Sequence, residues 1–144
     1  MQHIAIMKKS WGLLPKILTG EKKSESRWYQ NKYSPWDKIK KGDLVYFKNS
    51  GEPITIKVEV GRIIQFANLT LPKIKQILEK YGQKDGLGIN DIPKFYKLFK
   101  SKKYCILVFL KNAKQVKPFN INKKGFGMMS AWLCVENINK IKMN

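Results

Sequence analysis

The sequence predicts an α+β fold in which one curved, mostly antiparallel sheet carries peripheral helices. Residues 54–60 alternate apolar and polar side chains, which is the pattern of a strand with one buried face. Residues 104–110 are apolar on both faces, so they predict a central strand that includes Ile106 and Val108. The predicted helices fall between strands without regular alternation, which makes a doubly wound sheet a poor fit.

Apolar runs bounded by turn residues predict the other strands. In the strand that begins near Lys23, side chains alternate between the two faces, so Glu25, Arg27 and Tyr29 share one face. Ser24, Ser26 and Trp28 then point to the opposite face. In chain order, strands are expected at 2–7, 23–29, 44–49, 54–66, 104–110 and roughly 131–141.

Three helices are expected from capping residues and helical spacing. The first runs from an N-cap at Ser10 to Leu18 and ends at Gly20, because glycine is suited to a helix C-terminus. Thr70 is the expected N-cap of the second helix and Asn90 that of the third. Their apolar stripes are Ile74, Ile77, Leu78 and Tyr81, and Ile92, Phe95, Tyr96 and Phe99.

Length and composition favour a single domain over residues 1–144, with a core of ordinary size. No apolar run approaches the 18 to 20 residues or so that a membrane span needs, and the N-terminus lacks the features of a secretory signal, so we expect no membrane partner and a cytoplasmic location. Cys105, Cys134 and the single histidine, His3, have no metal-ligand spacing. We therefore expect reduced thiols, no metal and no cofactor, and no catalytic triad unless His3 takes part.

The formal charge is +19, divided into +7 for residues 1–48, +4 for 49–100 and +8 for 101–144. A folded domain with this excess presents a positive surface to polyanions, so we expect nucleic acid as the partner. Of the 29 basic residues, 27 are lysine, which also fits a compositional bias of the coding sequence, whereas phosphate-binding surfaces are often richer in arginine.

Residues 20–27 contain the pattern Gly20-x-Lys22-x-x-Glu25-x-Arg27, which follows a short apolar helix and precedes Gly42-Asp43 at the start of an apolar strand. This order of elements resembles the activating-signal-cointegrator homology (ASCH) domain of the PUA-like superfamily, and the resemblance covers most of the chain. It implies a PUA-like curved sheet or pseudo-barrel. The same residues also have a purely structural interpretation, as a helix C-cap and a same-face ion pair on a strand.

The resemblance implies a nucleic acid or a single base held in a cleft beside the barrel. Lys22 and Arg27 are suited to phosphate or carbonyl oxygens, and Glu25 to an amino or imino edge. Aromatic residues interleaved with lysine in the following segment suggest a base-stacking platform, although tryptophans there could equally belong to the core. The expected binding residues are Lys22, Glu25, Arg27, Trp28, Tyr29, Lys32 and Trp36.

Binding to RNA or a modified base, rather than duplex DNA, is therefore the favoured function, and no enzymatic activity is assigned. The alternative is a small hydrolase, either an amidohydrolase acting on a modified nucleoside or a ribonuclease. Some ASCH proteins hydrolyse an acylated cytidine with a Lys, a Thr and a Glu. Here Lys22 matches the lysine, but Glu25 stands at the threonine position, where a carboxylate cannot replace a hydroxyl nucleophile. Lys22 with Glu25 remains a candidate acid-base pair, and a protein-interaction adaptor is the third alternative.

Overall fold

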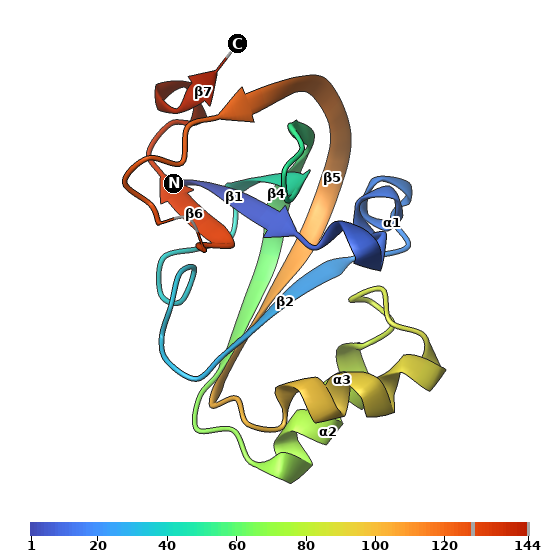
Figure 1. Cartoon of the computed structure of the whole chain (residues 1–144). Helices are drawn as coiled ribbons and strands as arrows, with labels where there is room; N and C mark the ends of the chain where they lie inside the picture. Colours follow the sequence, from blue (N-terminus) through green and yellow to red (C-terminus); the bar gives the residue numbers. More distant parts are fainter. Residues whose placement is uncertain (128, 144) are drawn as a thin grey trace.

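One strongly curled sheet forms the centre of the molecule (Figure 1). The computed structural model of the chain describes residues 1–127 and 129–143, with Ile89 described by its backbone only. Within these residues the strand order is β2-β5-β4-β3-β1-β6, and β7 pairs with the end of β5. The strands are β1 (Gln2–Met7), β2 (Ser24–Tyr29), β3 (Leu44–Asn49), β4 (Ile54–Phe66), β5 (Tyr104–Ile121), β6 (Trp132–Val135) and β7 (Lys142–Met143).

All strand pairs are antiparallel except β1 and β3, which run parallel. The sheet curls into a half-barrel with helices at its periphery, so the predicted α+β class with a curved, mostly antiparallel sheet is confirmed. The alternating segment of β4 buries its apolar side chains, as predicted. In β5, Ile106 and Val108 are fully buried, and this strand lies between β2 and β4, which confirms it as a central strand.

Strand β5 extends beyond the predicted end at residue 110 and continues to Ile121. The prediction ended at residue 110 because the run that is apolar on both faces ends there and the following residues are mostly polar. Pro118 lies between the paired positions Gln115 and Phe119, where the register with β4 shifts, so no ladder bond needs its missing donor. The last predicted strand is shorter than expected, since β6 ends at Val135 and a 3-10 turn, η3 (Ile138–Lys140), precedes β7.

The helices are α1 (Leu13–Thr19), α2 (Leu71–Tyr81) and α3 (Ile92–Phe99). The cap at Thr70 and the stop at Gly20 occur as predicted: Thr70 accepts a bond from the backbone N–H of Lys73, and Gly20 has a left-handed φ of 82°. The caps at Ser10 and Asn90 are wrong. Short 3-10 turns precede both helices, η1 (Lys9–Trp11) and η2 (Ile89–Asp91), and move the N-caps to Gly12 and Asp91.

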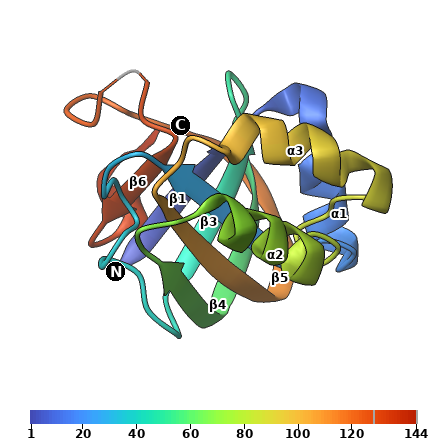
Figure 2. The ribbon, with the colours of Figure 1, turned by 90° about the horizontal axis from the view of Figure 1, so that it is seen from below.

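Helices α2 and α3 lie side by side below one end of the half-barrel (Figures 1 and 2). Ile74, Ile77 and Leu78 of α2 and Phe95 of α3 form a buried cluster with side chains from the sheet, including Trp28 and Leu107. This packing fixes the link that follows α2 (residues 82–88) against the free edge of β2. No helix among the described residues is long and apolar enough to cross a membrane.

Candidate functional site

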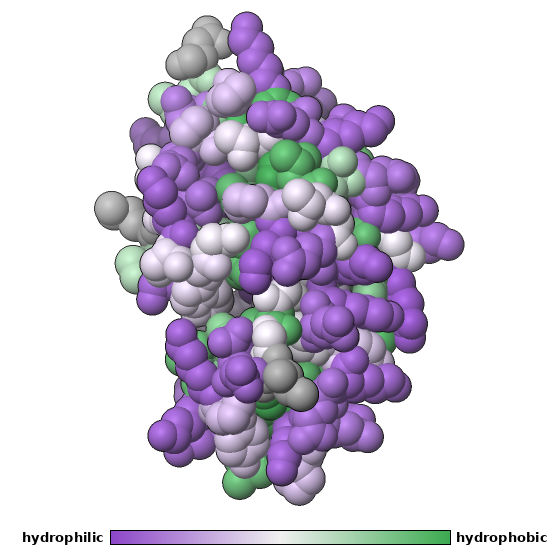
Figure 3. Space-filling view, turned by 90° about the vertical axis from the view of Figure 1, so that its right-hand side faces the viewer, coloured by the Kyte–Doolittle hydropathy of each residue, from purple (hydrophilic) through white to green (hydrophobic). Residues whose placement is uncertain are grey.

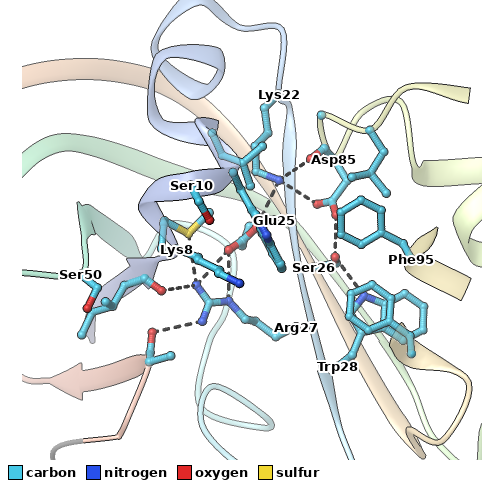
Figure 4. Close-up of a pocket in the computed structure, with 18 of the residues that line it drawn as sticks. Lys8, Ser10, Lys22, Glu25, Ser26, Arg27, Trp28, Ser50, Asp85 and Phe95 are labelled. Carbon is cyan, nitrogen blue, oxygen red and sulfur yellow. Dashed lines mark hydrogen bonds and ion pairs between the residues drawn. The ribbon is translucent and has the colours of Figure 1, made fainter. Parts of the chain in front are cut away.

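A cleft of about 680 Å³ opens between the sheet and the helices (Figure 4). Its size falls within the range of roughly 300 to 1,000 Å³ that is usual for ligand pockets. Strands β1 and β2 form one wall, and η1, the link before α3 and α3 itself form the other. Because β2 is an edge strand, side chains from both of its faces reach the cleft.

Lys22 lies at the floor of the cleft and is only 1% exposed. The stop at Gly20 turns the chain back, and the backbone N–H of Lys22 donates to the Lys16 carbonyl at 2.9 Å, which directs the lysine inward. Its Nζ donates to the Asp85 carbonyl oxygen and to Asp85 Oδ1 at 3.0 Å, and lies 3.2 Å from Glu25 Oε1. An ammonium has three protons, so these three acceptors use its full donor capacity.

Glu25 also binds Arg27, the second cation of the motif. Arg27 donates from Nε and Nη2 to Glu25 Oε2 at 3.1 and 2.9 Å. Nη1 donates to the Ala131 carbonyl at 3.1 Å, and Nη2 also donates to the Ile6 carbonyl at 3.3 Å. Ala131 precedes β6 and Ile6 belongs to β1, so the guanidinium joins β2 to the other end of the open sheet.

Asp85 completes a charged cluster of Lys22, Glu25, Arg27 and Asp85 (Figure 4). Its Oδ2 accepts a hydrogen bond of 2.6 Å from the Ser26 hydroxyl, which in turn accepts one of 3.0 Å from Trp28 Nε1. Ser24 donates to Oδ1 at 3.5 Å. The two serines therefore point away from Glu25, as alternation along the strand predicts, and face a second carboxylate.

Sequence reasoning missed Asp85, which lies 63 residues from Lys22 in the link between α2 and α3. The only local signal is the Asp85-Gly86 dipeptide, which indicates a turn but no partner. Hydrogen bonds to the backbone of the link hold it in place: the Lys84 carbonyl accepts the N–H of Ser24 at 2.9 Å, and the Lys16 side-chain Nζ donates to the Gly86 carbonyl at 3.2 Å.

The four charges of the cluster cancel, and burial together with neighbouring charges shifts their pKa values. Burial favours a raised pKa for Glu25, but Lys22 and Arg27 outweigh it and lower that pKa below its ordinary value of 4.5. Burial raises the pKa of Asp85 above 3.8, and the charge of Glu25 adds to the rise while Lys22 opposes it. Burial lowers the pKa of Lys22, but Asp85 and Glu25 outweigh it, so the lysine stays charged.

The aromatic residues at the cleft differ in how accessible they are. Trp28 is buried and stacks on Phe99 of α3 with ring centroids 4.6 Å apart. Tyr29 lines the cleft but donates its hydroxyl to the Ser34 carbonyl at 2.8 Å. Trp11 of η1, which no pattern in the sequence singled out, is 39% exposed and presents the most accessible indole of the cleft wall among the described residues.

Lys32 and Trp36, two of the expected binding residues, do not line the cleft. Trp36 is buried in the main core and packs edge-on against Tyr104 at 5.2 Å. Lys32 is exposed, with its Nζ 5.7 Å from the centre of the Tyr104 ring. Lys22, Glu25, Arg27, Trp28 and Tyr29 do lie together, whereas the segment beyond residue 30 turns away from them.

His3 is buried outside the cleft. Its Nε2 lies 2.9 Å from Asp43 Oδ2, while Nδ1 accepts a bond from Trp132 Nε1 at 3.1 Å and lies 3.4 Å from Cys134 Sγ. Burial lowers the pKa of His3 and raises that of Cys134, so the thiol is not activated. Within the described part of the chain no group of three or more His, Cys, Asp or Glu side chains is placed to hold a metal ion.

A scan against protein-family profiles and a search of curated proteins found no match for the sequence. Among solved structures, the ASCH protein of Zymomonas mobilis superposes with a TM-score of 0.66 over 94% of this chain and 87% of that protein, at 12% sequence identity. A single-residue variant of that protein gives a TM-score of 0.68 over 96% of this chain and 91% of the other, also at 12% identity. This chain has an ASCH-type fold.

A crystal structure of a hypothetical protein is similar at 22% identity, with a TM-score of 0.54 over 81% of this chain and the full length of that protein. At these identities the ASCH likeness concerns the fold, and it confirms the predicted PUA-like pseudo-barrel. What the ASCH-type cleft of this chain binds depends on its own side chains.

Proposed function

We propose that this ASCH-type chain binds single-stranded nucleic acid, RNA or a modified base in preference to duplex DNA, by holding one base in the cleft. The observation that carries the proposal is the combination of a neutral, hydrogen-bonding floor with aromatic walls and a rim of lysines. Recognition of single strands depends on this combination, because bases stack on aromatic rings while cations follow the phosphates.

The floor supports recognition of a donor edge. Lys22 uses all three of its donors on protein acceptors, and Arg27 donates to the protein from all three of its nitrogens, so their contacts do not support the phosphate-binding role expected for them. Their charges instead keep Glu25 ionised. Carboxylate oxygens accept more bonds than one each, so Glu25 and Asp85 retain acceptor capacity, and an amino or imino edge of a base complements them.

The rim supports contacts to phosphate. Lys8, Lys16 and Lys94 line the cleft, and Lys8 and Lys94 lie 5.8 Å from the ring centres of Trp11 and Phe95. The face of the molecule seen in Figure 3 is largely hydrophilic, with apolar patches between polar side chains. The positive charges of Lys8, Lys16 and Lys94 attract a polyanion toward the stacking surface of Trp11.

Fluorescence anisotropy with labelled RNA and DNA oligomers at low salt tests the proposal. We expect single-stranded RNA to bind, and affinity to fall steeply with salt because each neutralised phosphate releases counterions. Trp11→Ala and the charge reversal Lys94→Glu should each weaken binding about tenfold or more. Lys117→Glu, an equal charge change outside the cleft, is the matched control; no binding by the wild-type protein would refute the proposal.

A second candidate, hydrolysis of a modified nucleoside, is favoured by one contact. The Ser26 hydroxyl lies 2.6 Å from Asp85 Oδ2, a carboxylate with a raised pKa that Lys22 orients. A hydroxyl beside a positioned base is the minimal arrangement for a nucleophile. In this candidate Ser26 and Asp85, rather than Lys22 and Glu25, form the reacting pair.

Incubation with N4-acylated cytidine, followed by chromatography for released cytidine, tests this candidate. Ser26→Ala should abolish release if Ser26 is the nucleophile. Ser24→Ala is the matched control, because Ser24 is fully buried and contacts the same carboxylate only at 3.5 Å. Release that persists in Ser26→Ala, or no release by the wild-type protein, would remove the candidate.

A further inference from the structure

One end of the cleft offers hydrogen-bond donors that the protein does not use. Ser10 of η1 and Ser50 of the turn after β3 line the cleft, are exposed, and their hydroxyls donate to no other described residue. Lys8 lines the cleft with them, has no acidic partner among the described side chains, and its Nζ lies 5.8 Å from the centre of the Trp11 ring. This end therefore contrasts with the floor, where every donor of Lys22 is satisfied.

Backbone pairing fixes these groups relative to one another. The N–H of Ser50 donates to the Met7 carbonyl at 2.9 Å, which holds the turn after β3 against the end of β1, immediately before Lys8. Ser10 follows two residues later in η1. In Figure 4, Ser50 lies on the opposite side of Arg27 from Asp85 and Trp28, and Lys8 and Ser10 lie above Arg27, between the two sides.

Lys48 does not line the cleft but adds positive charge beside Ile6, which does. This lysine of β3 is only 9% exposed, makes no hydrogen bond or ion pair with a described residue, and pairs in the sheet beside Ile6, which lines the cleft. Burial and the nearby charge of Lys123 lower its pKa, while Glu52 opposes the shift. Glu52 also binds Lys9 at 2.7 Å and Asn49 at 3.0 Å, so its charge is shared with a second lysine.

We infer that the end of the cleft formed by Lys8, Ser10 and Ser50 is a phosphate subsite, and that the ligand of the cleft is a nucleotide rather than a free nucleoside. Two hydroxyls and an ammonium suit the several oxygens of a phosphate group, and the nearby charge of Lys48 stabilises the anion. The inference rests on the proposed function. It adds an assignment of each end of the cleft to one part of the ligand. The base lies toward Trp28 and Asp85, and its phosphate lies toward Ser10 and Ser50.

Isothermal titration with cytidine, guanosine and their 5′- and 3′-monophosphates tests the inference at constant ionic strength. We expect at least one monophosphate to bind about tenfold or more tightly than its nucleoside. The double variant Ser10→Ala/Ser50→Ala should remove most of that gain and leave nucleoside affinity within about twofold, because a nucleoside lacks the phosphate that these hydroxyls would contact. Lys117→Ala is the matched control for nonspecific charge, since Lys117 does not line the cleft.

Equal affinity for nucleoside and monophosphate would overturn the inference while leaving base binding intact. A gain that survives in the double variant would also overturn it. Inorganic phosphate is titrated in parallel as a competitor of the monophosphate. If phosphate displaces the monophosphate only at a concentration far above that of the nucleotide, the result supports a nucleotide ligand. If it does so at an equal concentration, the site binds free phosphate. Failure of nucleosides, monophosphates and oligomers alike would instead refute the proposed function.

Discussion

Arg27 connects parts of the sheet that no strand pairing joins. The sheet ends at β2 on one side and at β6 on the other, and this guanidinium contacts Glu25 on β2, Ile6 on β1 and Ala131 before β6. It also lies 5.0 Å from the ring centre of Trp132. Arg27, which the sequence suggested as a ligand-binding residue, therefore also joins the two sides of the half-barrel.

Replacing Arg27 by Ala should lower the free energy of unfolding by about 3 kcal/mol, because it leaves Glu25 buried with one cation fewer. Urea denaturation monitored by circular dichroism measures this loss. The only other arginine, Arg62, is exposed and stacks on Phe109 at 5.3 Å, so Arg62→Ala should cost less than about 1 kcal/mol. An unchanged stability in Arg27→Ala together with abolished ligand binding would show a direct role in recognition instead.

The two carboxylates of the cluster should respond to pH with opposite signs. The pKa of Glu25 is lowered, so its contribution to stability is present above its ordinary value of 4.5 and is lost as pH falls through the lowered value. The pKa of Asp85 is raised, so its contribution is present below 3.8 and is lost as pH rises through the raised value.

We therefore expect Glu25→Gln to flatten the decline in stability on acidification below about pH 4.5, and Asp85→Asn to make that decline steeper. Melting temperatures measured from pH 3 to pH 7 at constant ionic strength compare the two variants. The same pH dependence in both variants would mean that the two carboxylates titrate as one unit, contrary to their separate assignment.

At the scale of elements, the sequence predicted strands better than the contacts between them. Strands β1 to β4 follow from alternation and turn residues, which are local signals. Asp85 follows from no local signal, because it reaches Lys22 only when the link after α2 folds against β2. Trp36 likewise could not be placed from local signals. A tryptophan in a polar loop suggests a residue available for stacking, but tertiary packing buries it against Tyr104.

Helix α3 packs against β2 in part through an aromatic stack between Phe99 and Trp28. Phe99→Ala should destabilise the fold by about 3 kcal/mol, since it removes the ring that lies parallel to Trp28 and opens a cavity between helix and sheet. Leu98→Ala is the matched control, because Leu98 is 50% exposed and its replacement should cost less than about 1 kcal/mol. Urea midpoints of both variants compare the two faces of the helix, and equal losses would contradict this packing account.

At the scale of the whole molecule, the excess positive charge has opposite effects on folding stability and on nucleic-acid binding. The formal charge is +19, and the buried cluster contributes nothing to it because its four charges cancel. The excess therefore lies mostly on exposed lysines, which repel one another in the folded state and attract polyanions. Salt screens both effects, so it should act in opposite directions on the two properties.

Raising NaCl from about 20 to 300 mM should increase the melting temperature by several degrees, because a gain of about 1 kcal/mol shifts a domain of this size by roughly 4 °C. RNA affinity should fall over the same range.

Replacing Lys57, Lys114 and Lys117 by Gln, all outside the cleft, should reduce the salt dependence of melting but leave the slope of log affinity against log salt nearly unchanged. Replacing Lys8, Lys16 and Lys94 by Gln, an equal reduction of charge at the rim, should reduce that slope by about one for each phosphate that is no longer neutralised. Equal slopes in the two triple variants would mean that RNA is bound by the general charge of the surface and not at the cleft.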